Sequence, residues 1–143
     1  MGKARDHVAL DSSIYEGLAR FRLALRQFLA FSEAATQAAG VTPSQYQAML
    51  AIQTHPGGAI AIQELAAQML LQHNGAVQLV DRLARAELAE RQPSPTDRRR
   101  VLVVLTDKGR GLLERLASAH IVELMRYEPL LAESLRRLRD IGP

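Results

Sequence analysis

The sequence predicts a mainly α-helical protein with a small β-wing, in which a winged helix-turn-helix lobe lies between N- and C-terminal helices. Apolar residues recur at helical spacing along most of the 143 residues. A β-branched run from Val101 to Leu105 follows a turn with three consecutive arginines, which is typical of a strand in a hairpin. Only 4% of the residues are aromatic and tryptophan is absent, so the core must be built from aliphatic side chains that suit helix packing.

The first predicted helix begins near Ser13, because Ser13 to Glu16 has the Ser-x-x-Glu form of a capping box, and we expect it to end at Gly40. Its apolar residues follow steps of four and three, the spacing of a helix that packs along another helix for several turns. They are Ile14, Leu18, Phe21, Leu25 and Phe28. The pattern fits both a core helix of a bundle and a dimerisation helix.

A second helix is expected after Thr42, which starts another capping box with proline at the first helical position. The run from His55 to Gly58 should end this helix, and we interpret His55 as a helix-end residue, not a ligand. Ala59 to Ala61 is short enough for a small strand. A brief helix and a tight turn over 63–71 then lead into the next helix.

The helix that follows the turn has one buried stripe, formed by Ala76, Leu79, Val80, Leu83 and Leu88. The opposite face is polar, and we expect it to meet DNA through Gln72, His73, Asn74, Gly75, Gln78 and Arg82. In a helix-turn-helix unit the second helix lies in the major groove, where Asn and Gln can bind adenine in a bidentate manner. A polar helix start is also ordinary capping chemistry, and Asn74 alone would serve as a cap.

The wing is predicted around a turn that is rich in Pro and Ser, contains Asp97, and ends in three cations that are expected to bind DNA, namely Arg98, Arg99 and Arg100. The whole chain has a formal charge of +3 and a pI of about 9.8. Between Arg91 and Arg110, six basic residues stand against two acidic ones, so the positive charge is concentrated there. Such a focus suits DNA, although a solvated turn would show the same charges.

The C-terminal region is predicted to form two helices. Thr106 should cap the first, which runs to about Tyr127. Pro129 should open a separate last helix, because proline does not continue a helix without losing a hydrogen bond. The apolar stripe of that last helix consists of Leu131, Leu135 and Leu138.

Three features resemble the MarR family of transcription regulators over nearly the whole chain: LVDRL, its spacing to DRRR, and LTDKGRGLL. The resemblance implies one domain over 1–143. Within it, dimerisation helices are expected at 12–39 and 107–141, and a winged-helix lobe at 42–105. These outer helices would interlock with those of a second subunit.

The same resemblance implies roles for residues of the wing. Asp97 is expected to pair with one of the arginines and shape the wing, while a neighbouring arginine enters the minor groove. The short strand at Ala59–Ala61 is expected to pair with the wing hairpin. One departure from the family is Glu87, where a glycine usually stands. Glycine accepts a left-handed backbone freely, whereas a side chain there costs about 1 kcal/mol.

The resemblance also implies a region for effectors. In MarR-like proteins, aromatic anions often lodge where the dimerisation helices meet the DNA-binding lobe. Here that region includes Arg22, Phe28, Tyr46 and Met49. Arg22 could pair with an anionic ligand while the rings and the thioether cover its flat face. Ordinary packing and surface charge explain the same four residues.

No catalytic residue, metal site or cofactor is expected. The absence of cysteine excludes disulfides and thiolate metal sites. Histidines stand at 7, 55, 73 and 120 without the spacing of metal ligands, and His120 is expected at an interface or on the surface. No apolar run approaches the roughly 20 residues of a membrane span, and the MGKARDH start lacks the apolar segment of a signal peptide. We therefore expect a cytoplasmic protein without a membrane partner.

The leading hypothesis is a non-enzymatic homodimer that binds double-stranded DNA at a pseudo-palindromic operator and regulates transcription. The family resemblance favours a repressor that a small aromatic or anionic effector releases. An alternative is a DNA-architectural protein with little sequence specificity and no ligand control. An enzyme is the weakest hypothesis, since the sequence has neither site-like paired carboxylates nor a Gly-rich phosphate loop.

Overall fold

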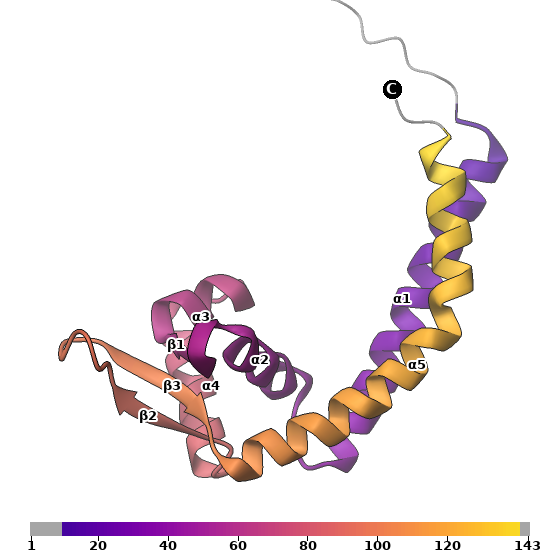
Figure 1. Ribbon diagram of the computed structural model, residues 1–143. Coiled ribbons are helices and arrows are strands. Elements are labelled where there is room, and N and C mark those ends of the chain that lie inside the picture. Colours follow the sequence, from indigo (N-terminus) through magenta and orange to yellow (C-terminus); the bar gives the residue numbers. More distant parts are fainter. Residues whose placement is uncertain (1–9, 141–143) are drawn as a thin grey trace, which may run out of the picture. The chain divides into compact units, whose positions relative to one another are not determined.

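The computed structural model describes residues 10–140, so the expectations for the MGKARDH start and for position 141 lie outside it. Its elements in chain order are α1 (Ser12–Ala38), α2 (Pro43–Thr54), the 3₁₀ turn η1 (Pro56–Gly58), β1 (Ala59–Ala61), α3 (Ile62–Met69), α4 (His73–Arg85), β2 (Ala89–Pro93), β3 (Val101–Leu105) and α5 (Asp107–Arg139). The predicted fold class, mainly helical with a small β-wing, is confirmed (Figure 1).

The chain divides into two compact units. One comprises residues 32–120 and contains the helix-turn-helix and the sheet, and we call it the winged-helix lobe. The other comprises the described parts of the two chain ends, residues 10–31 and 121–140, and we call it the helix pair. Both long helices, α1 and α5, contribute to both units.

The start of α2 is fixed by the predicted capping box. The Thr42 hydroxyl accepts a hydrogen bond from the backbone N–H of Gln45 at 3.1 Å, and the Gln45 side chain accepts one from the backbone N–H of Thr42 at 2.8 Å. Two otherwise unpaired backbone donors are thus satisfied. Within η1, Gly57 and Gly58 have φ angles of 72° and 68°, which turn the chain into β1 at low steric cost.

The turn between α3 and α4 is tight. Leu70 ends α3 in a left-handed conformation with φ of 54°, and the N–H of Leu71 bonds back to the carbonyl of Ala66 at 2.9 Å. The next helix begins only three residues after Leu70, at His73. This helix, turn and helix form the predicted helix-turn-helix unit.

The three strands form one antiparallel sheet in the order β1-β3-β2. Ile60 pairs with Val103, which confirms that the short strand joins the wing hairpin. On β3, Val103 and Leu105 are buried while Val101 is exposed and the residues between them are half-buried. One face of the sheet therefore packs on the core and the hairpin of β2 and β3 extends beyond the helices (Figure 1).

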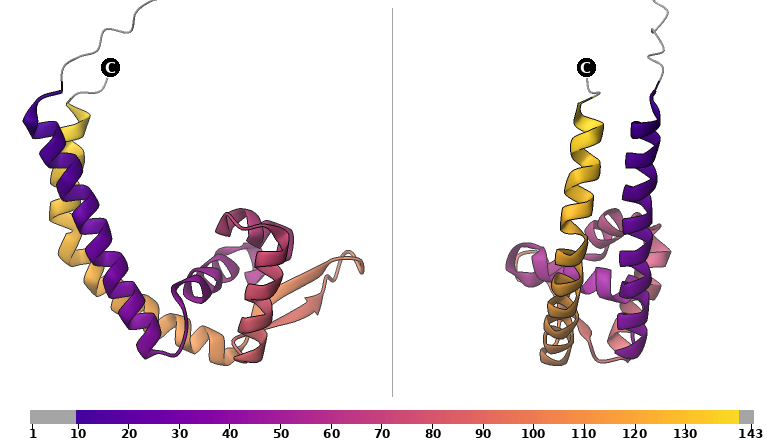
Figure 2. Two further views of the ribbon diagram at one scale, coloured as in Figure 1. Left: turned by 180° about the vertical axis from the view of Figure 1, so that it is seen from behind. Right: turned by 90° about the vertical axis from the view of Figure 1, so that its right-hand side faces the viewer.

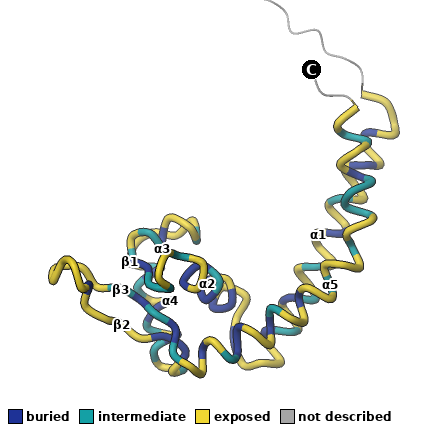
Figure 3. Tube along the Cα trace, viewed as in Figure 1, coloured by how far each residue is buried: buried dark blue, intermediate teal, exposed yellow. Residues whose placement is uncertain are grey.

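The core of the winged-helix lobe lies among α2, α3, α4, the sheet and the first turns of α5. Its side chains with no or almost no exposed surface include Met49, Ile52, Ile60, Leu65, Val80, Leu83 and Val103. Figure 3 shows the buried segments gathered on the inward faces of these elements. All four residues of the predicted inward stripe within α4 are buried, and so is Leu88 just after it. Burial of this stripe fixes which face of α4 points outward.

A closed junction joins the end of α4 to the start of α5. Glu87 has a φ of 60°, so the backbone is left-handed where a glycine was expected, although the residue is not glycine. The Thr106 hydroxyl donates to the carbonyl of Glu87 at 2.6 Å, and the Thr106 N–H donates to that of Leu88 at 3.0 Å. Thr106 also accepts from the N–H of Gly109 and caps α5 as predicted. A Cβ on Gly109 would lie 2.0 Å from the carbonyl oxygen of Leu88. The junction therefore requires glycine at position 109.

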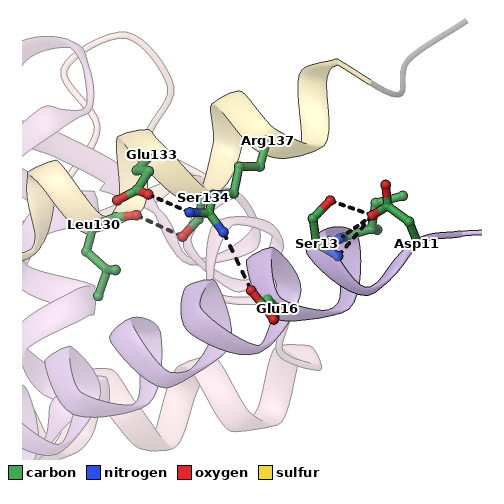
Figure 4. A network of polar contacts seen from close by, with 8 residues as sticks. Asp11, Ser13, Glu16, Leu130, Glu133, Ser134 and Arg137 are labelled. Atoms are coloured by element: carbon green, nitrogen blue, oxygen red, sulfur yellow. Dashed lines mark hydrogen bonds and ion pairs between the residues drawn. The ribbon is translucent and has the colours of Figure 1, made fainter.

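The helix pair begins with a cap that differs from the predicted one. Asp11, not Ser13, caps α1: its carboxylate accepts from the backbone N–H groups of Ser13 at 2.9 Å and Ile14 at 3.3 Å (Figure 4). Hydrogen bonds from the Ser13 hydroxyl, the strongest cause, and from these backbone groups lower the pKa of Asp11. The capping-box prediction was wrong because a carboxylate two residues earlier is the better acceptor for a helix start.

Within the helix pair, the N-terminal turns of α1 and the C-terminal turns of α5 lie side by side (Figure 2). A Cβ on Gly17 would come within 4 Å of Ser134 and Leu138. Arg137 donates to Glu133 at 2.8 Å and pairs with Glu16 on α1 at 3.8 Å (Figure 4). Small and mixed polar groups thus let the two helices pack closely.

The prediction that Pro129 opens a separate helix was wrong. Helix α5 is continuous from Asp107 to Arg139 with Pro129 inside it. Proline removes one backbone donor and disturbs one turn, a local cost. The turns that follow continue to pack against α1 through Ser134 and Leu138, and this packing can offset that cost.

His120 was expected at an interface or on the surface and instead lies inside the winged-helix lobe, with only 4% of its surface exposed. Its Nδ1 lies 2.6 Å from the carbonyl of Leu116, and its Nε2 lies 2.8 Å from the hydroxyl of Ser32. Its ring stacks on Tyr46 with centroids 4.4 Å apart. The expectation failed because helical spacing cannot show that a serine 88 residues away supplies a partner.

Candidate nucleic-acid interface

The outer face of α4 presents polar side chains that have no partner among the residues that the structure describes. Of the predicted reading residues, five have exposed side chains, namely Gln72, His73, Asn74, Gln78 and Arg82. No side-chain hydrogen bond or ion pair of these five residues occurs within residues 10–140, apart from bonds of their backbones. A set of unpaired donors and acceptors on a rigid helix is suited to recognition of an external polar partner.

The start of α4 has the chemistry of an anion-facing helix terminus. Gln72 is the N-cap but makes no side-chain capping bond, and the first turn has no acidic residue. Asn74 lies inside the first turn, so it is not the cap that the alternative interpretation allowed. The free N–H groups and the helix dipole give this end a partial positive charge, which favours phosphate.

Gly75 is half-buried on the first turn of α4. A Cβ there would meet only Leu71, at 3.7 Å, which is an ordinary contact. The packing of the described residues thus does not require glycine at this position. Its small size leaves room for an external partner to approach the backbone.

The wing is held by hydrogen bonds that begin at Ser94 and Asp97. The N–H of Ser94 donates to the carbonyl of Arg100 at 3.0 Å, and the N–H of Arg100 donates to that of Asp97 at 3.0 Å. The hydroxyl of Ser94, itself buried, accepts from the N–H groups of Thr96 and Asp97 at 3.3 Å each. Sequence reasoning took Ser94 only as a turn residue. Its hydroxyl and backbone close the base of the loop.

Asp97 braces the wing in a different way from the one the family resemblance implied. Its carboxylate accepts from the backbone N–H of Arg99 at 3.0 Å, and no guanidinium pairs with it within the described part of the chain. An aspartate readily bonds the backbone two residues ahead of it in a turn. The expected ion pair is therefore replaced by a backbone hydrogen bond, which shapes the loop without binding an arginine side chain.

The three wing arginines are not equivalent. Arg100 donates to Glu64 of α3 at 2.8 Å, and the other oxygen of the same carboxylate lies 2.5 Å from His55. Arg98 and Arg99 are exposed and have no ion-pair partner within residues 10–140. Sequence reasoning missed Glu64, because nothing local marks a glutamate that bonds an arginine 36 residues away.

Three other basic side chains between Arg91 and Arg110 bind acidic or carbonyl groups of the protein itself. Arg91 pairs with Asp81 of α4 at 2.6 Å, and Lys108 donates to the carbonyl of Ala86 at 3.0 Å. Arg110 donates to the carbonyl of Leu105 at 2.8 Å. These groups connect strands and helices. Arg98 and Arg99 are the cations of this segment that remain without such a partner in the described structure.

A small groove connects the wing with both helices of the helix-turn-helix. It has a volume of about 240 Å³ and is lined by Ala61, Ile62, Gln63, His73, Arg99, Arg100 and Val101. The start of α3, the first residue of α4 and the root of the wing thus border one concave surface. The guanidinium groups of Arg99 and Arg100 give that surface a positive character suited to a phosphate chain.

The predicted effector residues are distributed over both units. Arg22 and Phe28 belong to the helix pair, with Arg22 exposed and Phe28 half-buried. Tyr46 and Met49 belong to the core of the winged-helix lobe, and Met49 has no exposed surface. Burial raises the pKa of Tyr46. The effector pocket stays a prediction.

A second groove, of about 690 Å³, lies on the outer face of the sheet. Its polar lining includes Gln53, Glu90, Gln92 and Arg110. Among the described residues, no group of three or more His, Cys, Asp or Glu side chains could hold a metal ion. No helix of residues 10–140 has the length and apolar character to cross a membrane.

Comparison with known proteins assigns the family. A MarR family model matches residues 39–100, which run from the end of α1 to the wing. The chain is 33% identical over 94 residues to the transcriptional regulator MhqR of Bacillus subtilis; the match covers 66% of this chain and 63% of MhqR. The chain thus spans a little under two thirds of the length of that curated relative.

Solved structures share the fold. AbsC, a MarR family regulator from Streptomyces coelicolor, matches with a TM-score of 0.73 and 21% identity, over 92% of this chain and 90% of AbsC. A mutant MarR from E. coli, solved with operator DNA, matches with a TM-score of 0.66 and 20% identity, over 85% of this chain and 90% of that chain. Together with the winged helix-turn-helix and the matched family model, these findings show that the chain belongs to the MarR family.

Proposed function

We propose that this protein is a homodimeric, sequence-specific DNA-binding regulator of transcription. The observation that carries the proposal is one concave surface on which His73, at the start of the exposed polar face of α4, lies with Arg99 and Arg100 of the wing. The structure of a MarR protein with operator DNA supports the same use of this fold. The proposed place of action is the cytoplasm, where a regulator can reach DNA, and no catalytic activity is part of the proposal.

The two parts of this surface have different proposed tasks. The polar residues of α4 enter the major groove, where Asn74 and Gln78 hydrogen-bond base edges. Gln72, His73 and Arg82 extend the contact to neighbouring bases and phosphates, and Gly75 lets the backbone approach. Arg98 and Arg99 bind phosphates or the narrow minor groove beside it.

The proposed dimer is supported by apolar side chains that the helix pair leaves exposed. On α1 these are Leu18, Leu23, Leu25 and Leu29; on α5 they are Ile121, Val122, Met125 and Leu135. A set of this size is unusual on the surface of a monomeric protein. A second copy of the same chain would bury it and place two α4 helices about 34 Å apart, one turn of duplex DNA.

The dimer is tested by Leu25→Asp, which puts a charge into the apolar stripe. We expect loss of the dimer and of stability, measured by sedimentation at micromolar concentration and by thermal unfolding. Gln27→Asp, at an exposed polar position on the same helix, is the control and should leave both unchanged. A stable wild-type monomer at that concentration would contradict the proposal.

Regulation is proposed to be repression that an aromatic or anionic effector relieves. The effector would bind near Arg22, Phe28, Tyr46 and Met49 and change the geometry of the two DNA-binding lobes, with a coupling of about 1 to 3 kcal/mol. A thermal-shift screen of aromatic acids tests for it, because a ligand at 100 times its Kd stabilises the native state by about 2.7 kcal/mol. An acid that competes with DNA only through Asn74 or Arg99 would contradict this mechanism.

DNA binding itself is tested by selection from a random duplex library, followed by footprinting of the enriched sequence. A discrete, pseudo-palindromic footprint is the expected result. Uniform, salt-sensitive coating of every duplex would instead favour a DNA-architectural protein. Absence of binding to any duplex at 50 mM salt would overturn the proposal.

A further inference from the structure

Three ionisable side chains from distant parts of the sequence meet where the wing joins α3. His55 follows α2, Glu64 lies in the first turn of α3, and Arg100 precedes β3. The two carboxylate oxygens of Glu64 have different partners. One lies 2.5 Å from Nε2 of His55, and the other accepts a hydrogen bond from Arg100 at 2.8 Å. The side chains of His55, Glu64 and Arg100 are 26%, 41% and 50% exposed, so the cluster is partly open to solvent.

Both ring nitrogens of His55 face oxygen acceptors. Nδ1 lies 2.7 Å from the backbone carbonyl of Ala59, and a carbonyl oxygen can only accept. Nε2 faces the carboxylate of Glu64, which also only accepts when it is ionised. A neutral imidazole has one N–H and could satisfy only one of these contacts. Only the imidazolium ion can donate to both oxygens at once.

We propose that His55 and Glu64 are positioning residues for the wing, and that they hold it through Arg100 when His55 is protonated. This inference rests on the proposed DNA-binding function. Arg100 then links the wing to α3 through its ion pair with Glu64, and it is not one of the DNA-contacting cations predicted from sequence. Because Arg98 and Arg99 directly precede Arg100, this ion pair also sets the position of their side chains.

The proposal has a direction with pH. Histidine is the side chain that changes charge between about pH 5 and 8. At low pH the imidazolium joins Ala59 and Glu64, so the wing root is held. When the proton is lost at higher pH, the ring can donate to only one of the two oxygens, so the link between Ala59 and Glu64 is broken. DNA binding should therefore be stronger at pH 6 than at pH 8.

Other groups near the cluster must be separated from His55. His73 and Arg99 line the adjacent groove with Arg100, and His73 could itself gain a contact to phosphate when it is charged. Asp97 faces the backbone of Arg99 on the wing. Because His73 is the other histidine beside the cluster, it needs its own control.

The first experiment needs no DNA. Long-range proton–nitrogen NMR of the full-length protein at pH 6 reports the state of each histidine ring, and His55→Gln assigns the His55 signals. We expect both nitrogens of His55 to carry protons, and Glu64→Gln to alter those signals. A His55 ring with one unprotonated nitrogen at pH 6, or signals that Glu64→Gln does not change, would overturn the proposal even if the protein binds DNA as proposed.

The second experiment measures anisotropy with the duplex that wild-type protein enriches most from a random library, at pH 6 and 8 and fixed ionic strength. Wild type should bind about 2- to 5-fold more tightly at pH 6 than His55→Gln does, the range of an exposed ion pair. In the His73→Gln variant, the part of the change in DNA affinity between pH 6 and pH 8 that is due to His55 should remain. Without any duplex that binds, the proposed function fails, while the NMR result still stands.

A double-mutant cycle tests the route through Arg100. If His55 acts through Glu64 and Arg100, His55→Gln should have no further effect in the Arg100→Gln background. Arg100→Lys keeps a cation for Glu64 and should restore part of the affinity. Arg100→Gln should also leave the salt dependence of binding nearly unchanged, unlike Arg99→Gln. Additive effects of the first pair, or a loss of one counterion with Arg100→Gln, would show that Arg100 contacts DNA and would overturn the proposal.

Discussion

The outer face of α4 and the wing both present polar groups to an external partner, but the protein holds them in different ways. On α4, the exposed side chains have no hydrogen-bond partners in residues 10–140, and their positions come from the buried stripe beneath them. In the wing, Ser94 and Asp97 bond the backbone, while Glu64 holds Arg100. The helix is fixed by its core, and the loop is fixed by local polar contacts.

This difference has a physical cause. A helix satisfies its own backbone hydrogen bonds, so its outer side chains can change without disturbing its path. A loop has unpaired backbone groups that side chains must satisfy. In the wing, the residues that make these bonds are also the neighbours of the arginines. Substitutions on α4 should therefore change what is read, and substitutions in the wing should change how the cations are presented.

The largest effect is expected at Gly109, which packs against the segment that connects α4 to the first strand of the wing. Gly109→Ala would place a Cβ 2.0 Å from the carbonyl oxygen of Leu88, at the junction that ends α4 and starts α5. Because backbone must move, we expect a loss of about 3 kcal/mol, the upper end of overpacking costs. Urea unfolding measures it, and DNA binding by both regions should weaken together.

Gly111→Ala is the matched control, two residues along the same helix. A Cβ there would meet only the end of the Arg115 side chain, at 3.7 Å. Alanine has the higher helix propensity, so this variant should be as stable as wild type or up to about 1 kcal/mol more stable. Equal stability of the two variants would show that the junction adapts and that the two regions do not depend on it.

The parts of the fold that could be predicted from sequence are those with local causes. The inward stripe of α4, the alternation of β3 and the Thr42 capping box are periodic or short-range signals, and the structure confirms each. The outward position of Asn74 and Gln78 follows from the same stripe. A single sequence suffices where residues three or four positions apart decide the outcome.

The parts that could not be predicted depend on partners distant in sequence. His120 is buried because Ser32 and Tyr46 receive it, and Arg100 is held because Glu64 lies beside it. Pro129 remains inside α5 although local rules end a helix there. In each case tertiary packing overrides or completes a local preference, and no pattern within one helical turn reports it.

The next effect sharpens the role of α4. Asn74→Ala or Gln78→Ala should reduce discrimination between the enriched duplex and a mutated duplex by about 1 to 3 kcal/mol, since a lost bidentate contact has that value. The melting temperature should not change, because neither side chain has a partner in the described fold. Gln47→Ala on α2 is the control for loss of an exposed amide. Equal weakening on both duplexes would mean that α4 does not read bases.

A smaller effect separates charge from shape in the wing. Arg99→Ala should lower the salt slope of binding by about one counterion on every duplex. Asp97→Ala should reduce affinity by about 1 kcal/mol with little change of slope, because the arginines stay charged but lose the bond that orders the loop. Asp97→Asn keeps an oxygen acceptor and should recover most of the affinity. Titrations at several salt concentrations distinguish these results, and an unchanged slope for Arg99→Ala with an intact dimer would exclude the wing as a DNA contact.

The smallest effect concerns the link between the two regions at Glu87. Its φ of 60° is one that a side chain adopts only at a cost, and its ion pair with Lys108, at 3.8 Å between exposed groups, adds little. Glu87→Gly should therefore stabilise the protein by up to about 1 kcal/mol in urea unfolding. Glu87→Ala removes the same carboxylate but keeps the Cβ, so it should leave stability nearly unchanged. If alanine and glycine stabilise equally, the strain is not in the backbone, and if neither changes stability, the bonds of Thr106 to this turn already absorb it.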